Sequence, residues 1–177
     1  MRGTKNYRRV ASRRAVKSVW LWLIVFLFAP GAVSASPGET AAQTAGKAEL
    51  LALHSADREA HFKHDVPRLT ARMAPQIVDI RDGQINRVSR EEVRQKFAEY
   101  FKHAEFSKWD DLEPPVVWVA PDGMSGWMAM RVRIAYTEMT DAGKKARDEV
   151  CAWMSAYEKR DGKWIMTAVT STFGPEK

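Results

Sequence analysis

Hydrophobic residues recur every three or four positions in the stretch KAELLALHSADREAHFKHD, which begins at Lys47. This period predicts an amphipathic helix. The residues on its apolar side are Leu50, Leu53, Ala56 and Ala60. Asp65 then stands where a side chain can cap a second, short helix, because Pro67 is tolerated in a first helical turn. Pro75 is expected to end that helix.

Further along the chain, polar and apolar residues alternate with the period of half-buried strands. Asp82-Gly83 separates two such runs and predicts a tight hairpin turn. A third helix is predicted after Ser89, because Glu92 completes a capping box. Four more strands are predicted after this helix, and Asp161-Gly162 forms the last turn. The order α-α-β-β-α-β-β-β-β predicts an α+β fold that ends in a long antiparallel run.

The first 35 residues have the order of a secretory signal peptide. A basic segment without acidic residues precedes an apolar run from Val19 to Ala29, and the small residues that follow predict cleavage after Ala35. The apolar run is about half as long as a membrane-spanning helix. Export to the periplasm or the exterior is therefore favoured, with an uncleaved anchor as the alternative. We expect a flexible linker at 36–46, the folded domain at 47–173 and a tail at 174–177.

The positive net charge belongs to this leader. The chain has 28 Lys and Arg against 22 Asp and Glu, and seven of the basic residues precede residue 36. The rest of the chain is close to neutral and lacks a basic cluster with interleaved aromatic residues, which argues against nucleic-acid binding. Cys151 is the sole cysteine, so an internal disulfide is excluded, and a packing role is expected for this thiol.

Four segments follow one another in the predicted domain: HFKHDVPRLTARMAP, IVDIRDGQI, SREEVRQKFAEYF and AYEKRDGKWIMTAVTSTF. In this order they resemble the nuclear transport factor 2-like superfamily, in particular its SnoaL-like and ketosteroid-isomerase-like branch, over residues 47–173. The resemblance implies a curved antiparallel sheet wrapped around the helices as a cone with a pocket. It also implies that a dimer through the outer sheet face is common. Because the fold hosts isomerases, cyclases, dehydratases, ligand binders and assembly modules, it does not decide function.

Three polar residues share one face of the first helix, since they are spaced three and four apart: His54, Asp57 and His61. They form either an acid–base cluster facing the pocket or a solvated helix surface. A shared metal ion is disfavoured because the two histidines are two turns apart. By resemblance to ketosteroid isomerases, Asp79 is another candidate base, with Tyr136 as hydrogen-bond donor to an oxyanion. The alternative for Asp79 is an ion pair with Arg81.

Alternation in the last three strands predicts which side chains face the pocket. The predicted ligand-binding wall consists of Met130, Val132, Ile134, Tyr136, Met154, Met166, Ala168 and Thr170. By resemblance, many relatives carry histidines at the places that Ala168 and Thr170 take here, so this wall lacks polar groups found in catalytic relatives. The residues predicted on the outer face, as a possible homodimer interface, are Trp127, Arg131, Trp153 and Tyr157.

These observations favour an exported protein that binds a small hydrophobic molecule in the pocket of the cone. The first alternative is an isomerase, cyclase or dehydratase that uses Asp79, His54 or His61 as its base. The second alternative is a dimeric assembly module that docks through its outer sheet face. Neither a metal site nor a cofactor is predicted, and membrane contact is expected only through an uncleaved leader.

Overall fold

A computed structural model describes residues 38–174, and the predicted signal peptide lies outside the described residues. The described part of the chain forms three helices and seven strands, in agreement with the α+β class predicted from the sequence. No helix in it is long and apolar enough to cross a membrane. In chain order the elements are α1 (Ala41–Phe62), α2 (Val66–Thr70), β1 (Met73–Arg81), β2 (Gln84–Ser89), α3 (Arg90–His103), β3 (Ala104–Asp111), β4 (Val116–Val119), β5 (Ser125–Thr140), β6 (Gly143–Arg160) and β7 (Lys163–Phe173).

Helix α1 begins at Ala41, earlier than its hydrophobic period predicts. The Thr40 hydroxyl accepts a hydrogen bond from the Gln43 N–H at 3.1 Å, and the Gln43 side chain accepts one from the Thr40 N–H at 2.9 Å. This capping box satisfies backbone donors that the start of a helix otherwise leaves unpaired. Residues 41–46, expected in the linker, therefore belong to α1. Their small side chains carry no hydrophobic period that would reveal the helix.

The first half of α1 is held on the sheet by packing and by polar contacts. Gly46 lies so close to the sheet that an added Cβ would be 2.9 Å from Val119 Cγ1 and 3.1 Å from Trp164 Cζ2. The Trp164 indole N–H donates to the Glu49 carboxylate at 2.7 Å, and Lys159 Nζ is 2.6 Å from the same oxygen. The β6–β7 hairpin therefore anchors the start of the helix.

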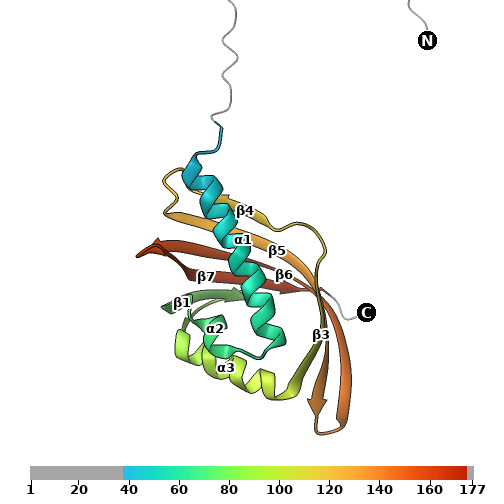
Figure 1. Cartoon of the computed structure of the whole chain (residues 1–177). Helices are drawn as coiled ribbons and strands as arrows, with labels where there is room; N and C mark the ends of the chain where they lie inside the picture. The colour runs from blue at the N-terminus through green and yellow to red at the C-terminus, as the bar shows by residue number, and fades with distance from the viewer. Residues whose placement is uncertain (1–37, 175–177) are drawn as a thin grey trace, which may run out of the picture. The chain divides into compact units, whose positions relative to one another are not determined.

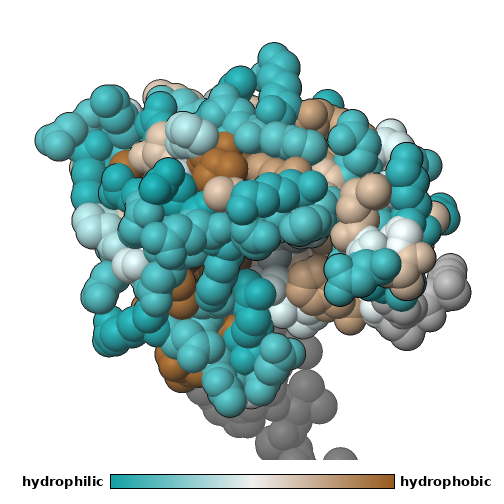
Figure 2. Space-filling model, turned by 90° about the horizontal axis from the view of Figure 1, so that it is seen from below, coloured by the Kyte–Doolittle hydropathy of each residue, from teal (hydrophilic) through white to brown (hydrophobic). Residues whose placement is uncertain are grey.

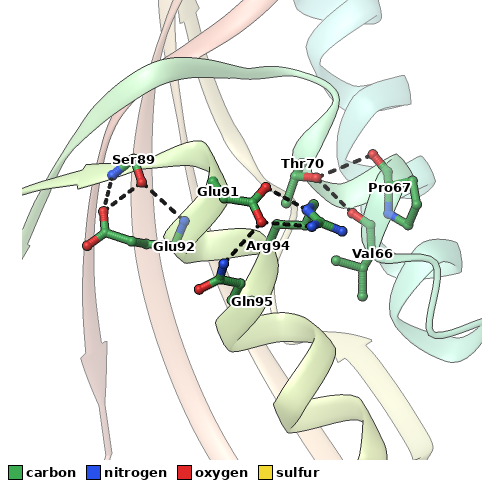
Figure 3. A network of polar contacts seen from close by, with 8 residues as sticks. All are labelled: Val66, Pro67, Thr70, Ser89, Glu91, Glu92, Arg94 and Gln95. Atoms are coloured by element: carbon green, nitrogen blue, oxygen red, sulfur yellow. Dashed lines mark hydrogen bonds and ion pairs between the residues drawn. The ribbon is translucent and has the colours of Figure 1, made fainter.

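The two shorter helices begin at the capping residues that the sequence predicts. The Asp65 carboxylate accepts a hydrogen bond from the Arg68 N–H at 3.0 Å. At the start of α3, the Ser89 hydroxyl accepts from the Glu92 N–H at 3.2 Å, and the Glu92 carboxylate accepts from the Ser89 N–H at 2.7 Å (Figure 3). These caps fix where α2 and α3 start, and α3 packs beside β1 and β2.

The strands form one curved sheet, antiparallel except for the parallel pair of β1 and β7. Its order is β2-β1-β7-β6-β5-β3, and β4 pairs with the part of β5 that β3 leaves free. Helix α1 runs across one face of this sheet (Figure 1). Strand β3 is not predicted from the sequence, because a bulge between Phe106 and Lys108 interrupts the alternation of its buried residues.

Strand register decides which side chains face the helices, because directly opposite residues of an antiparallel pair point to the same side. Buried Met130 of β5 is opposite Trp153 of β6. The inner residues of β6 are therefore the odd-numbered ones, and Met154 lies on the outer face with 43% of its surface exposed. The predicted inward orientation of Met154 is wrong, as is the outward orientation predicted for Trp153 and Tyr157.

A bulge in the last hairpin shifts the alternation of β7 by one residue. Ala156 is opposite Ala168, whereas its neighbour Tyr157 is opposite Met166, so Thr167 has no partner position of its own. Met166 faces the helices as predicted, but the positions beyond the bulge are inverted. Two residues predicted in the pocket wall consequently lie on the outer face: Ala168 and Thr170.

The main hydrophobic core fills the space between α1 and the sheet. Its fully enclosed large side chains come from α1, β4 and β5, and they are Leu50, Val119, Met128 and Val132. Enclosing each such side chain stabilises the fold by roughly 1.5–3 kcal/mol. Seen from below, the surface of the domain is mostly hydrophilic, and hydrophobic patches show between the polar side chains (Figure 2).

Candidate functional site

A cavity of about 540 Å³ lies between the helices and the inner face of the sheet. All three helices and every strand except β4 contribute to its wall. Its apolar lining includes Leu69, Met73, Ile77, Val88, Val93, Phe97, Phe106, Trp109, Met128, Met130, Ile134, Cys151, Trp153, Met166 and Val169. Arg81, Lys96 and Phe173 line the cavity as well, and they are exposed to solvent, which marks its opening.

The polar face predicted on the first helix is directed into this cavity. His54, Asp57 and His61 all line it, whereas their neighbours Arg58 and Glu59 are exposed on the surface of α1. The alternative of a solvated surface for this cluster is therefore wrong. Helical spacing brings the three side chains together, and the groups around each ring or carboxyl decide what it can do.

His54 is held by a carboxylate from the sheet. Its ring is buried, and Nε2 lies 2.8 Å from Asp111 Oδ1 at the end of β3, so the ring N–H donates to that carboxylate. The expected partner of a histidine on this face is Asp57, but Asp111 takes that place. The contact fixes the orientation of the ring and joins the middle of α1 to β3.

The Asp57 carboxyl has no hydrogen bond or ion pair with any residue that the structure describes. Burial raises the pKa of this carboxyl to about 7, and the charge of Arg68 offsets only part of the rise. Burial also raises the pKa of the Tyr157 hydroxyl, and the nearby Asp57 charge adds to that effect. Asp57 is therefore present in both protonation states near neutral pH, which suits a general acid or base.

His61 is a neutral imidazole with one free nitrogen. Its Nδ1 is 2.8 Å from the Asp57 carbonyl oxygen, which accepts, so Nδ1 carries the proton and Nε2 carries a lone pair. Burial lowers the pKa of the ring to about 4, although the bond to the carbonyl acts in the opposite direction. Phe97 and Phe106 approach the ring edge-on, with centroids 5.6 and 5.7 Å away.

A second polar group lies where α3 faces β5 and β6. The Tyr136 hydroxyl donates to Glu149 Oε1 at 3.3 Å, and the Tyr100 and Tyr136 rings are 5.9 Å apart. Burial is the largest cause that raises the pKa of both tyrosines, and the Glu149 charge adds to it. Both hydroxyls therefore stay protonated at neutral pH and remain hydrogen-bond donors.

No protein-family model matches the sequence, and no curated protein matches it. Solved structures do match. A ketosteroid isomerase-like protein from Erwinia carotovora atroseptica is 17% identical, with a TM-score of 0.57 over 72% of this chain and 96% of that protein. A protein from Streptomyces avermitilis described as a dehydratase of the nuclear transport factor 2-like family is 12% identical, with a TM-score of 0.57 over 75% and 99% of the two chains. The described domain has the nuclear transport factor 2-like fold.

A third solved structure with this fold is described as a protein of another kind. It is a calcium/calmodulin-dependent protein kinase II association domain from Xanthomonas campestris, 23% identical, with a TM-score of 0.56 over 73% of this chain and 88% of that one. At identities this low the likeness establishes the fold alone. What the site does must therefore be argued from its own side chains.

Asp79, the base expected from the resemblance, lines the cavity, but its carboxylate forms an ion pair. Arg81 Nε is 3.0 Å from Asp79 Oδ2, and the pair stands at the opening. The surface ion pair considered as the alternative is thus present. The Asp79 carboxylate is thus already engaged by a guanidinium, whereas Asp57 has no ion pair with a described residue.

Several residues that line the cavity are missing from the set predicted from the sequence. For β6, the inward-facing residues could have been found from the turn that joins it to β5. Thr140 pairs with Gly143 across a two-residue turn, so odd-numbered β6 residues lie opposite even-numbered β5 residues. Val132, predicted in the pocket wall, is fully enclosed in the core instead. The residues missed on the strands include Trp109, Glu149, Cys151, Trp153, Ser155, Tyr157, Val169 and Ser171.

Proposed function

We propose that the domain binds a small, mostly apolar molecule in the cavity between the helices and the sheet. The observation that carries this proposal is the space of about 540 Å³ with an apolar and aromatic wall. Pockets for small molecules usually measure about 300–1,000 Å³ and hold a few polar groups that orient the ligand. Here those groups are gathered largely on α1 and on the strands facing it.

Titration with N-phenyl-1-naphthylamine, a neutral fluorophore that brightens in apolar surroundings, tests ligand binding. We expect saturable binding at one site per chain. Ile134→Trp puts a larger side chain into the cavity and should weaken binding about tenfold or more. Met154→Trp makes a comparable change on the outer face and should leave the affinity unchanged. Non-saturable binding, or an equal loss in both variants, contradicts the proposal.

We further infer an enzyme of the isomerase or dehydratase type as the second candidate function, with Asp57 as the group that moves a proton. The observation in its favour is a carboxyl in the cavity that lacks a partner among the described residues and has a pKa of about 7. Asp57 is preferred over Asp79 because Arg81 already pairs with Asp79. The names of two fold neighbours, a ketosteroid isomerase-like protein and a dehydratase, agree with this class of reaction.

Hydrogen–deuterium exchange at the carbon next to the carbonyl of 1-tetralone, a neutral apolar ketone, tests proton transfer. Proton NMR should show faster exchange with the protein than in buffer. Asp57→Asn should slow the protein-dependent rate by roughly 100-fold, the usual scale for loss of a general base. Asp79→Asn is the matched control and should keep most of the rate. If exchange is no faster with the protein than in buffer, the enzyme hypothesis is contradicted and ligand binding remains the proposed function.

Export remains part of the proposal, because the basic segment, the apolar run and the small residues up to Ala35 have the order of a signal peptide. Expression of the whole chain in a bacterium with two membranes should yield a periplasmic protein whose first residue is Ser36. An intact N-terminus in that fraction contradicts cleavage.

A further inference from the structure

Two fully enclosed side-chain atoms in the cavity wall lack hydrogen-bond partners among residues 38–174. They are the indole nitrogen of Trp109 and the hydroxyl oxygen of Ser171. Trp109 is only 6% exposed, so bulk water does not accept a hydrogen bond from its N–H either. Buried indole N–H groups generally find a partner, because an unpaired buried donor destabilises the fold. The molecule in the cavity is the natural source of that partner.

The His61 ring packs against the Trp109 ring and carries an unpaired acceptor. His61 Nε2 carries a lone pair, since Nδ1–H donates to the Asp57 carbonyl, and no described residue bonds to Nε2. The ring centroids of His61 and Trp109 are 4.5 Å apart. Because burial lowers the pKa of His61 to about 4, the lone pair is available at neutral pH.

We propose that the ligand of this cavity carries a hydroxyl group, whose oxygen accepts from Trp109 Nε1–H and whose proton is donated to His61 Nε2. This inference rests on the proposed function and adds the chemical class of the ligand. A hydroxyl donates and accepts at a single atom, so it satisfies both side chains. A carbonyl would leave His61 unpaired, and an ammonium group would leave Trp109 unpaired.

The placement of charged residues in the described cavity wall favours a ligand without a net charge. Arg81 and Lys96 are its cationic residues, and both are exposed at the opening rather than beside Trp109. A carboxylate beside Trp109 would meet the lone pair of His61, and neither Arg81 nor Lys96 lies beside Trp109 to compensate its charge. Burial of an unpaired anion is strongly unfavourable.

The aromatic side chains of the cavity wall favour a ligand that contains a ring. The Trp109 and Trp153 rings meet edge to face at 5.9 Å, and Phe97 and Phe106 lie around His61. Aromatic walls of this kind pack well against flat apolar surfaces. The ligand class is therefore a neutral, hydroxylated ring compound, such as a phenol or a cyclic alcohol.

Titration with 2-naphthol, naphthalene and 2-naphthoate at neutral pH tests this assignment. We expect 2-naphthol to bind about tenfold tighter than naphthalene, and 2-naphthoate to bind more weakly than either. Trp109→Phe keeps an aromatic ring but removes the N–H, so it should abolish the preference for 2-naphthol over naphthalene. Trp153→Phe is the matched control from the same wall and should keep the preference.

The possible outcomes separate this inference from the proposed function. If the wild-type protein binds 2-naphthol and naphthalene equally, or prefers 2-naphthoate, the hydroxyl assignment is overturned while ligand binding stands. If Trp109→Phe keeps the preference, the role of its N–H is overturned. If none of the three compounds binds, the proposed function fails as well. The wild-type comparison decides the ligand class even if the Trp109 variant does not fold.

Discussion

Asp57 and His61 are one helical turn apart on α1, and burial drives both toward their neutral forms. The pKa of the Asp57 carboxyl rises to about 7, and the pKa of the His61 ring falls to about 4. Between these two values the carboxyl is mostly protonated and the imidazole mostly uncharged. This part of the cavity wall is thus least charged in mildly acidic to neutral solution, where a neutral ligand fits it best.

The raised pKa of Asp57 predicts a pH-dependent stability difference between the wild-type protein and Asp57→Asn. The folded pKa of about 7 exceeds the reference value of 3.8, so the folded state binds the proton more tightly than the unfolded state. Stability from this group is fully present below the unfolded pKa and is lost as the pH rises through the folded pKa. From pH 5 to pH 8, the wild type should lose roughly 2–3 kcal/mol relative to Asp57→Asn.

Urea unfolding at pH 5 and pH 8 measures this difference. His61 titrates over part of the same range, with a lowered pKa, but it is present in both proteins and its contribution largely cancels. Lys96→Gln, an exposed change at the cavity opening, is a control that should follow the wild-type dependence. A constant difference between Asp57→Asn and the wild type at the two pH values would mean that Asp57 ionises in the folded protein as it does in water.

At the scale of elements, α1 packs tightly against the sheet at Gly46. A Cβ at this position would be 2.9 Å from Val119 Cγ1, which is too close without a shift of one of the two elements. Gly46→Ala should therefore destabilise the domain by about 1–2 kcal/mol, because overpacking outweighs the gain of about 1 kcal/mol in helix propensity. In a Val119→Ala background the same change should be neutral or stabilising.

Denaturant unfolding of the four proteins in this double-mutant cycle gives the coupling between the two positions, which we expect to be at least about 1 kcal/mol. A substitution elsewhere on the helix serves as control, and Ala45→Ser on its exposed side should show no coupling to Val119→Ala. Additive effects of Gly46→Ala and Val119→Ala would show that the helix is not seated as closely as the distances imply.

Element types and order were predictable, apart from strand β3, because caps and turns are local. The Ser89–Glu92 capping box and the Asp82-Gly83 turn depend on residues within four positions of one another. The faces of β6 and β7 depend on register, which is set by a turn and by the bulge at Thr167. Both possible faces of β6 are largely uncharged near Trp153, so hydrophobicity alone cannot choose between them. The partnerless N–H of Trp109 is a tertiary property and has no counterpart in the sequence pattern.

At the scale of the whole domain, the inverted faces leave an apolar outer surface on the sheet. One row crosses four strands through opposite residues and consists of Val116, Ala129, Met154 and Thr170. The adjacent row consists of Trp118, Trp127, Ala156 and Ala168. Val116 is 57% exposed and Trp118 is 43% exposed. The outer face thus retains Trp127 and Arg131 as predicted. Its exposed apolar residues include Met154 of β6 and Trp118 of β4, whereas Trp153 and Tyr157 face the helices.

An exposed apolar surface of this kind predicts that the domain associates through the outer face of its sheet. A dimer with two-fold symmetry through this face would contain two Met154 side chains in its interface, one from each copy. Met154→Glu would then bury two unpaired carboxylates and should weaken association by roughly 100-fold or more. Met139→Glu is the matched control, because Met139 is 45% exposed near the far end of β5. Sedimentation velocity at micromolar concentration should show a dimer for the wild type and for Met139→Glu, and a monomer for Met154→Glu. A monomeric wild type excludes the dimer, and a Met154→Glu dimer moves the interface elsewhere.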